Sequence, residues 1–181
     1  MKTRIALLLV ILILAAAFAG CQRKLKSEAD FMRRAREILP AGAADAAVMQ
    51  YAGFTISPDN RRTYLHWVVS GDEHEDHAYL PMECERALPS WEYAFVRSYE
   101  AGECMEDVAV LEWEGRIVFC VNNTDVRGMR WTEADGTEQK VSFEQFPYSS
   151  YPFLRDLDAG CTSVTFLDAE GNELPAEGIP D

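Results

Sequence analysis

The sequence predicts a mostly β (α+β) protein, in which an N-terminal amphipathic helix packs on an antiparallel β-sheet or sandwich. Two observations lead to this prediction. One stretch of helical periodicity follows an apolar leader, and from residue 48 onward short runs of β-branched and aromatic residues alternate with turn residues, which is typical of antiparallel strands. Residues 22–181 have the length of one domain, and an apolar content of 48% is sufficient for a core.

The chain opens with a leader that indicates export. Lys2 and Arg4 precede an uninterrupted apolar run at residues 5–19, and Gly20 and Cys21 close that run. A charged start, an apolar stretch and small residues before a cleavage site are the parts of a secretory signal peptide. As a helix the run reaches about 22 Å, short of the ~30 Å hydrocarbon core of a bilayer, so we do not expect a spanning helix.

The end of the leader, Phe18-Ala19-Gly20-Cys21, resembles the lipobox of bacterial prolipoproteins, with Phe18 where leucine is usual. The resemblance implies that residues 1–20 are removed, that Cys21 carries the lipid, and that the protein is held on the extracytoplasmic face of the cell membrane. Two or more acyl chains hold a protein durably on a bilayer. The alternative is an uncleaved anchor, which the basic residues after Cys21 favour, because such residues tend to stay cytoplasmic.

Charge divides the remaining chain into a basic neck and an acidic head. Residues 22–40 carry six basic and three acidic residues, a balance of +3, whereas residues 41–181 carry 9 basic and 27 acidic residues, a balance of −18. Anionic headgroups attract basic segments and repel acidic ones, so we expect residues 21–26 to act as a lipidated basic tether and the head to stand off the bilayer. So acidic a head is not expected to bind nucleic acid.

Residues 27–40 predict the amphipathic helix. Ser27 is a good N-cap, and Pro40 ends the segment. Apolar residues recur between them at the helical spacing i, i+4, i+7 and i+8, namely Phe31, Ala35, Ile38 and Leu39. Residues 41–44 are expected to form a loose connector.

The acidic β-rich domain, residues 41–174, begins with four predicted strands. Residues 48–56 and 63–69 flank Ser57-Pro58-Asp59-Asn60, where proline and asparagine favour a turn, and so predict a hairpin. Residues 78–85 and 92–99 are the next two β-like runs. All four are expected to be antiparallel.

The strongest core signal lies at residues 108–113 and 116–121, which flank Glu114-Gly115. A two-residue turn there predicts pairs on one face, Leu111 with Val118 and Ala109 with Cys120, and pairs on the other, Val110 with Phe119 and Val108 with Val121. Both faces of this hairpin are apolar. A strand pair that buries both faces is expected inside a sandwich, or in a sheet that a helix covers.

The last third of the chain predicts further hairpins and one long loop. Residues 126–131 and 140–143 flank an Asp-Gly turn, and residues 162–167 and 173–174 flank a second turn that contains Gly171. The aromatic segment between them, residues 144–158, is expected to be a loop folded over the core. Residues 175–181 are expected to be a frayed tail.

Four cysteines follow Cys21: Cys84, Cys104, Cys120 and Cys161. An even number of cysteines in an exported chain suggests two disulfides. We favour the pairs Cys84 with Cys104 and Cys120 with Cys161, with buried free thiols as the alternative. The spacing contains no Cys-x-x-Cys, so neither a zinc knuckle nor a thioredoxin-type site is expected.

The densest polar cluster is the loop at residues 71–77. Its candidate metal ligands are Glu73, His74, Asp76 and His77, since imidazole and carboxylate groups can hold a divalent ion such as zinc. The spacing does not match the His-Glu-x-x-His pattern of zincins. The alternative is a solvated acidic loop, and no other cofactor is indicated.

Aromatic residues offer a second candidate site. Tyr148, Tyr151 and Phe153 could present a surface for a glycan or a peptide, because aromatic side chains supply large contact areas at small entropic cost. Trp67 and Trp113 lie inside apolar strands and are expected in the core. The alternative for the three loop aromatics is that they also cover the core.

Taken together, these patterns predict a membrane-anchored extracytoplasmic lipoprotein that acts as a binding or accessory domain of the cell envelope. Its partners are the membrane, through the N-terminal lipid, and an unidentified protein or glycan. No catalytic motif points to a reaction. The alternative is a metal-binding envelope hydrolase or cation-binding protein that uses the acidic head.

Overall fold

The computed structural model describes residues 24–45, 48–71, 77–87, 89–143 and 151–179. The leader and Cys21 lie outside these residues. The prediction of a mostly β protein is confirmed, because the described chain forms three four-stranded antiparallel sheets.

The three sheets follow one another along the chain, except for one strand. The first sheet has the order β1 (Met49–Ile56), β2 (Thr63–Ser70), β3 (Ala78–Ala87), β4 (Glu92–Ser98). The second has the order β10 (Phe153–Asp158), β7 (Arg116–Val121), β6 (Val108–Trp113), β5 (Gly102–Met105). The third has the order β12 (Glu173–Leu174), β11 (Thr162–Leu167), β8 (Gly128–Thr132), β9 (Glu138–Ser142). Strand β10 therefore returns to the second sheet between strands of the third.

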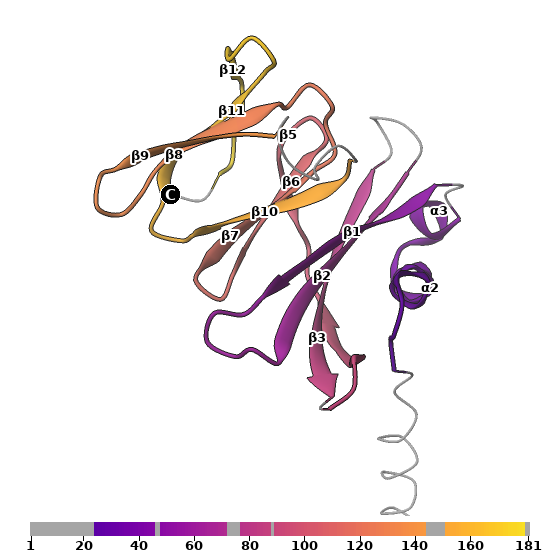
Figure 1. The fold of residues 1–181 in the computed structure, drawn as a ribbon. Coiled ribbons are helices and arrows are strands. Elements are labelled where there is room, and N and C mark those ends of the chain that lie inside the picture. Colours follow the sequence, from indigo (N-terminus) through magenta and orange to yellow (C-terminus); the bar gives the residue numbers. More distant parts are fainter. Residues whose placement is uncertain (1–23, 46–47, 72–76, 88, 144–150, 180–181) are drawn as a thin grey trace, which may run out of the picture.

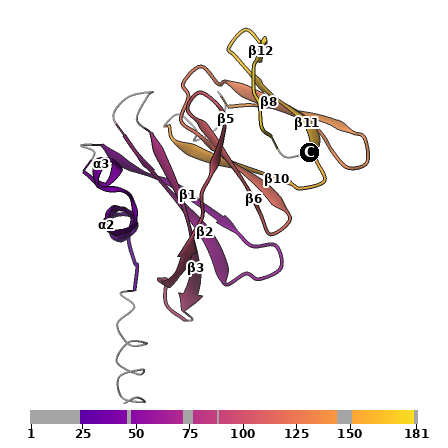
Figure 2. The same ribbon diagram turned by 180° about the vertical axis from the view of Figure 1, so that it is seen from behind.

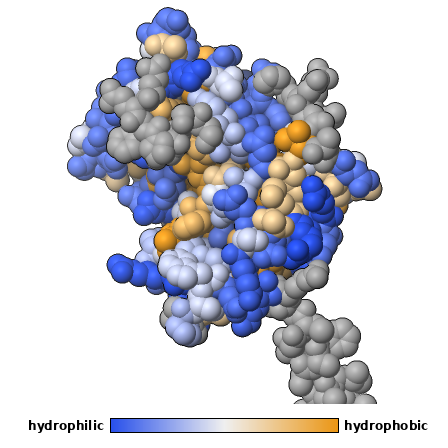
Figure 3. All heavy atoms as spheres, turned by 45° about the vertical axis from the view of Figure 1, so that its right-hand side comes forward, coloured by the Kyte–Doolittle hydropathy of each residue, from blue (hydrophilic) through white to orange (hydrophobic). Residues whose placement is uncertain are grey.

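Helix α2 (Glu28–Ile38) is followed by the short helix α3 (Ala41–Ala44), where a loose connector was expected. Ser27 caps α2 in a capping box with Asp30. Phe31 and Ala35 are buried on one face of α2, and the Phe31 ring stacks on the His66 imidazole of β2 at a centroid distance of 4.0 Å. On the side of the molecule that carries α2, the exposed surface is mostly hydrophilic with small apolar patches (Figure 3).

Strand β2 of the first sheet is buried on both faces, since all eight of its residues are buried. Alternate side chains of a strand point to opposite faces. Tyr64 and Val68 join a core with Phe31 of α2, whereas Leu65 and Trp67 join a core with strands of the second sheet. Figures 1 and 2 show the first sheet between α2 and the second sheet.

The β6–β7 hairpin has the predicted register, with Ala109 opposite Cys120 and Val110 opposite Phe119. Ala109 and Cys120 belong to the core shared with the first sheet, and Val110 and Phe119 to the core shared with the third. The prediction that both faces of this hairpin are buried is confirmed. The second sheet is therefore the central layer of the three.

Two predictions about the C-terminal third were wrong. Residues 153–158, expected in a loop, form strand β10 and pair with β7. Phe153 and Leu157 enter one core and Leu154 the other, so this segment is an alternating strand with apolar residues on both faces. The segment expected to be a frayed tail is bound to the folded domain: the Glu177 amide donates to the Cys104 carbonyl at 2.6 Å, and Ile179 packs on the core.

The predicted disulfides are not formed, since Cys84, Cys104, Cys120 and Cys161 are free and buried. Cys84 lies in the core under α2, Cys120 between the first and second sheets, and Cys104 and Cys161 between the second and third. Each predicted pair would join two different cores, which is the reason that neither bond can form in this fold. Burial raises the pKa of the Cys84 and Cys104 thiols to about 12.

Candidate functional site

An open groove of about 690 Å³ lies at one end of the first sheet. It is lined by residues 38–40 at the end of α2, residues 77–80 at the start of β3, and residues 98–101 and 103 after β4. Strands β3 and β4 are antiparallel, with Met82 opposite Ser98, so the start of one and the end of the other meet at the same edge. The groove is thus built from three segments that the sheet brings together.

A histidine and an aspartate lie together at the side of the groove. His77 Nδ1 is 2.6 Å from Asp107 Oδ1, and His77 Nε2 is 3.2 Å from Asn122 Nδ2. With the Asn122 amide donating to Nε2, Nδ1 carries the hydrogen and donates to Asp107. The Asn122 backbone amide also donates to the Asp107 carbonyl, at 2.8 Å.

The hydrogen bonds of His77 to Asp107 and Asn122 suit a structural role better than a catalytic one. In a triad that activates a nucleophile, the second imidazole nitrogen accepts a hydrogen bond from a hydroxyl or thiol. Here the Asn122 amide takes that place, and an amide nitrogen is not a nucleophile. The pair therefore ties the start of β3 to the turn before β6 and keeps one wall of the groove fixed.

The groove itself is acidic and aromatic. Glu100 and Glu103 are exposed carboxylates on its lining, and the lining contains no lysine or arginine among the residues that the structure describes. Tyr79 Oη is buried without a hydrogen-bond partner in the described chain. Burial raises the pKa of Tyr79 above its ordinary value, and neighbouring Cys120 and Asp107 raise it further. Carboxylates beside aromatic rings are a suitable environment for a cation.

A buried carboxylate positions Tyr99, which also lines the groove. Glu83 Oε2 accepts hydrogen bonds from Tyr99 Oη, from Trp113 Nε1 at 3.2 Å and from Arg97 Nη2 at 3.0 Å. Burial acts to raise the pKa of Glu83, but these three hydrogen bonds hold it below its ordinary value. Glu83 was not among the functional residues predicted from the sequence. Its only signal was an acidic residue at an inward position of an apolar strand.

The predicted metal site lies mostly outside the described residues. Glu73, His74 and Asp76 fall in the gap between residues 71 and 77, and His77 is the only one of the four candidates that the structure describes. Within the described ranges, no group of three histidine, cysteine, aspartate or glutamate side chains is placed to hold a metal ion. The metal-binding alternative therefore gains no support from the described chain.

Of the predicted aromatic binding surface, the structure describes Tyr151 and Phe153, and both pack against the core. Phe153 is 5% exposed and belongs to the core between the second and third sheets. The Tyr151 hydroxyl donates to the Val126 carbonyl at 2.7 Å, and its ring packs 5.3 Å from that of Phe153. Tyr148 lies outside the described residues. The pairing of β10 with β7 turns Phe153 inward, and Tyr151, which precedes β10, packs partly buried against the same core.

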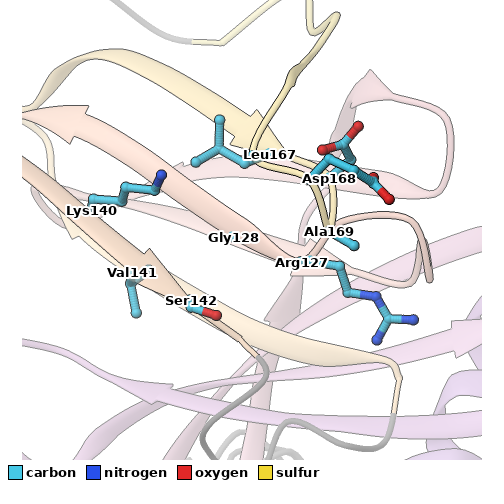
Figure 4. A pocket seen from close by; sticks show the side chains of 10 residues that line it. Arg127, Gly128, Lys140, Val141, Ser142, Leu167, Asp168 and Ala169 are labelled. Carbon is cyan, nitrogen blue, oxygen red and sulfur yellow. The ribbon is translucent and has the colours of Figure 1, made fainter.

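A second, smaller pocket of about 230 Å³ lies on the third sheet, between β8, β9 and the turn before β12. Its lining mixes charges, with Arg127 on the same side as Asp168 and Lys140 at the opposite end (Figure 4). Asp168 accepts hydrogen bonds from the backbone and side chain of Asn172, at 2.8 and 2.9 Å, and so shapes its own turn. The groove on the first sheet is larger and carries charge of one sign, so it is the better candidate.

Comparisons with protein-family models, curated proteins and solved structures found no match to this chain. Neither described helix is long and apolar enough to cross a membrane.

Proposed function

We propose that this protein is a lipid-anchored extracytoplasmic lipoprotein that acts as a binding or accessory domain of the cell envelope, and that its groove takes a basic segment of a protein partner. The observation that carries the proposal is the lining of the groove, where Glu100 and Glu103 stand beside Tyr79 and Tyr99 with no described basic residue. A cleft lined by one sign of charge attracts ligands of the opposite sign.

The anchor rests on the leader and on Cys21, whose resemblance to a lipobox implies acylation and removal of residues 1–20. In this proposal the head is one unit, with α2 packed on the first sheet through Phe31 and Ala35. Intact mass of the membrane-extracted protein tests the anchor. The expected mass is that of residues 21–181 plus acyl groups, and an unmodified full-length chain would contradict it.

A basic peptide is a better candidate than a glycan. Sugars are often held on exposed aromatic faces, but Phe153 of the predicted aromatic surface is buried. The groove instead offers two exposed carboxylates, which suit lysine and arginine side chains. Binding is favoured over catalysis because the imidazole of His77 is engaged by Asp107 and Asn122 at the wall of the groove.

Calorimetry with pentalysine tests the groove, using the mature protein in nanodiscs of zwitterionic lipid. Glu100→Gln/Glu103→Gln should weaken pentalysine binding about tenfold, which corresponds to about 1.4 kcal/mol. The matched control is Glu112→Gln/Glu114→Gln, which removes the same charge from two exposed positions outside the groove. No heat with pentalysine, or an equal loss in both variants, would contradict the proposal.

A further inference from the structure

The end of the first sheet opposite the groove carries an unusual surface. The β1–β2 turn and the β3–β4 turn lie side by side there, and the Arg86 amide donates to the Arg62 carbonyl at 2.8 Å. Basic side chains lie on the β1–β2 turn, at the end of β3 and on the first described residues: Lys24, Lys26, Arg61, Arg62 and Arg86. The turns and strand ends carry three arginines against the acidic residues Asp59 and Glu85. Lys24 and Lys26 pair with Glu92, and Asp30 lies next to Lys26.

An exposed tryptophan stands on the same turns. Trp91 is 65% exposed, and the Arg86 guanidinium lies 3.4 Å from the centroid of its ring. The other three tryptophans of the chain, Trp67, Trp113 and Trp131, are buried. An exposed indole beside cationic side chains is the arrangement found at membrane–water interfaces, where the ring sits at headgroup level.

The described chain begins at this surface. Leu25 is 2% exposed and exchanges two backbone hydrogen bonds with Tyr93, at 2.8 and 2.9 Å, while Lys24 and Lys26 both bind Glu92 at 2.7 Å. The neck expected to be a free tether is therefore part of the fold from Lys24 onward. Figures 1 and 2 show this start of the chain beside the end of β3.

The distance from the anchor to this surface is short. Cys21 and Lys24 are three residues apart, and three residues span at most about 11 Å. A lipid on Cys21 holds the Trp91 end of the first sheet at the bilayer, whatever path the chain takes between them. A head that stands off the membrane, as expected from its overall charge, does not fit this connection.

We propose that the Trp91 end of the first sheet docks on the anionic membrane surface that carries the anchor. The Trp91 ring lies among the headgroups, and Arg61, Arg62 and Arg86 bind their phosphates. This proposal rests on the lipid anchor proposed above. It also orients the binding site. Strand β3 runs from the groove to the Trp91 end, and its ten residues span about 33 Å, so the groove faces away from the bilayer.

Fluorescence quenching by lipid tests the docking. The mature lipoprotein is reconstituted into vesicles of phosphatidylglycerol and phosphatidylcholine, with or without bromine on the acyl chains near the headgroups. Brominated lipid should quench part of the tryptophan emission, and the quenched part should be absent in Trp91→Phe. Unchanged emission of the lipidated wild type, or the same quenching in Trp91→Phe, would overturn the proposal.

A charge reversal sharpens the test. Arg61→Glu/Arg62→Glu should lower the quenching towards the level of Trp91→Phe, whereas Arg127→Glu/Lys140→Glu, which reverses two exposed cations on the third sheet, should leave it unchanged. Equal losses in both double variants would overturn the role of these arginines. The mass of the same sample separates the two proposals: an unmodified Cys21 contradicts the anchor itself, whereas a lipidated Cys21 without quenching contradicts only the docking.

Discussion

The two ends of the first sheet differ in charge although the same strands build both. One end carries Trp91 with Arg61, Arg62 and Arg86, and the other carries the groove with Glu100 and Glu103. Between them, β2 is buried along its whole length. A protein polarised in this way is oriented by an anionic surface, which attracts one end and repels the other. Trp91, Arg61, Arg62 and Glu100 lie in connections between strands, whereas the strands supply the core.

The largest effect on stability is expected from the core between the first and second sheets, which contains Trp67. Trp67→Ala should lower the free energy of unfolding by about 3–5 kcal/mol, because this fully buried side chain joins the first and second sheets. Trp91→Ala is the matched control and should change stability little, because Trp91 is exposed. Urea unfolding measures both. Similar losses in the two variants would mean that Trp91 is structural and not a docking residue.

The next effect concerns Glu83, which positions Tyr99 in the groove. Glu83→Gln should cost about 1–3 kcal/mol at pH 7, because a buried acceptor for three donors loses its charge. The lowered pKa of Glu83 stabilises the fold above the ordinary carboxyl pKa, and this contribution is lost as the pH falls towards the folded value. The variant should therefore lose less stability than the wild type between pH 5 and pH 3. Parallel losses would show that Glu83 is not the titrating group.

A comparable effect is expected on the face of the first sheet that α2 covers. Burial lowers the pKa of His66 from 6.5 to about 3. The unfolded chain therefore takes up a proton near pH 6.5 and the folded protein does not, so stability falls below that pH, by about 2 kcal/mol at pH 5. The His66 ring should show no NMR titration down to pH 5. A ring that titrates near pH 6.5 would contradict its burial beneath Phe31.

The smallest effect is expected at the Trp91 end of the first sheet, where the first described residues of the chain are bound. Glu92 binds Lys24 and Lys26, and hydrogen bonds from these two lysines lower the pKa of its carboxyl to about 2. Glu92→Gln should leave the melting temperature almost unchanged but speed hydrogen exchange at the Leu25 amide, which is bound to the Tyr93 carbonyl. Glu85→Gln, at the same end, should leave that amide unaffected. Equal exchange in both variants would show that the ion pairs do not fix the neck.

Much of the fold could be predicted because its patterns are local. The β6–β7 register followed from two apolar faces and the Glu114-Gly115 turn. Strand β10 was missed because Arg155 and Asp156 interrupt its apolar residues. In the folded protein the Arg155 guanidinium lies 5.2 Å from the centroid of the Trp131 ring, so a charged side chain is accommodated against an aromatic one.

The site could be predicted only in fragments because distant segments build it. His77 was singled out, but its partners Asp107 and Asn122 lie 30 and 45 residues further along the chain. In the same way, Arg62 in the β1–β2 turn and Arg86 at the end of β3 meet only through the pairing of β2 with β3. Sequence showed an acidic head but could not show that three of its nine basic residues, Arg61, Arg62 and Arg86, lie at one end of the first sheet.

Hydrogen exchange can follow both ends of the first sheet at once and therefore tests the proposed orientation on the membrane. Hydrogen exchange of the lipidated protein is measured by mass spectrometry in phosphatidylglycerol vesicles and in detergent micelles. We expect slower exchange on vesicles at residues 57–62 and 89–92, and unchanged exchange at residues 98–103 in the groove. Protection of the groove, or no difference at the Trp91 end, would contradict the orientation proposed here.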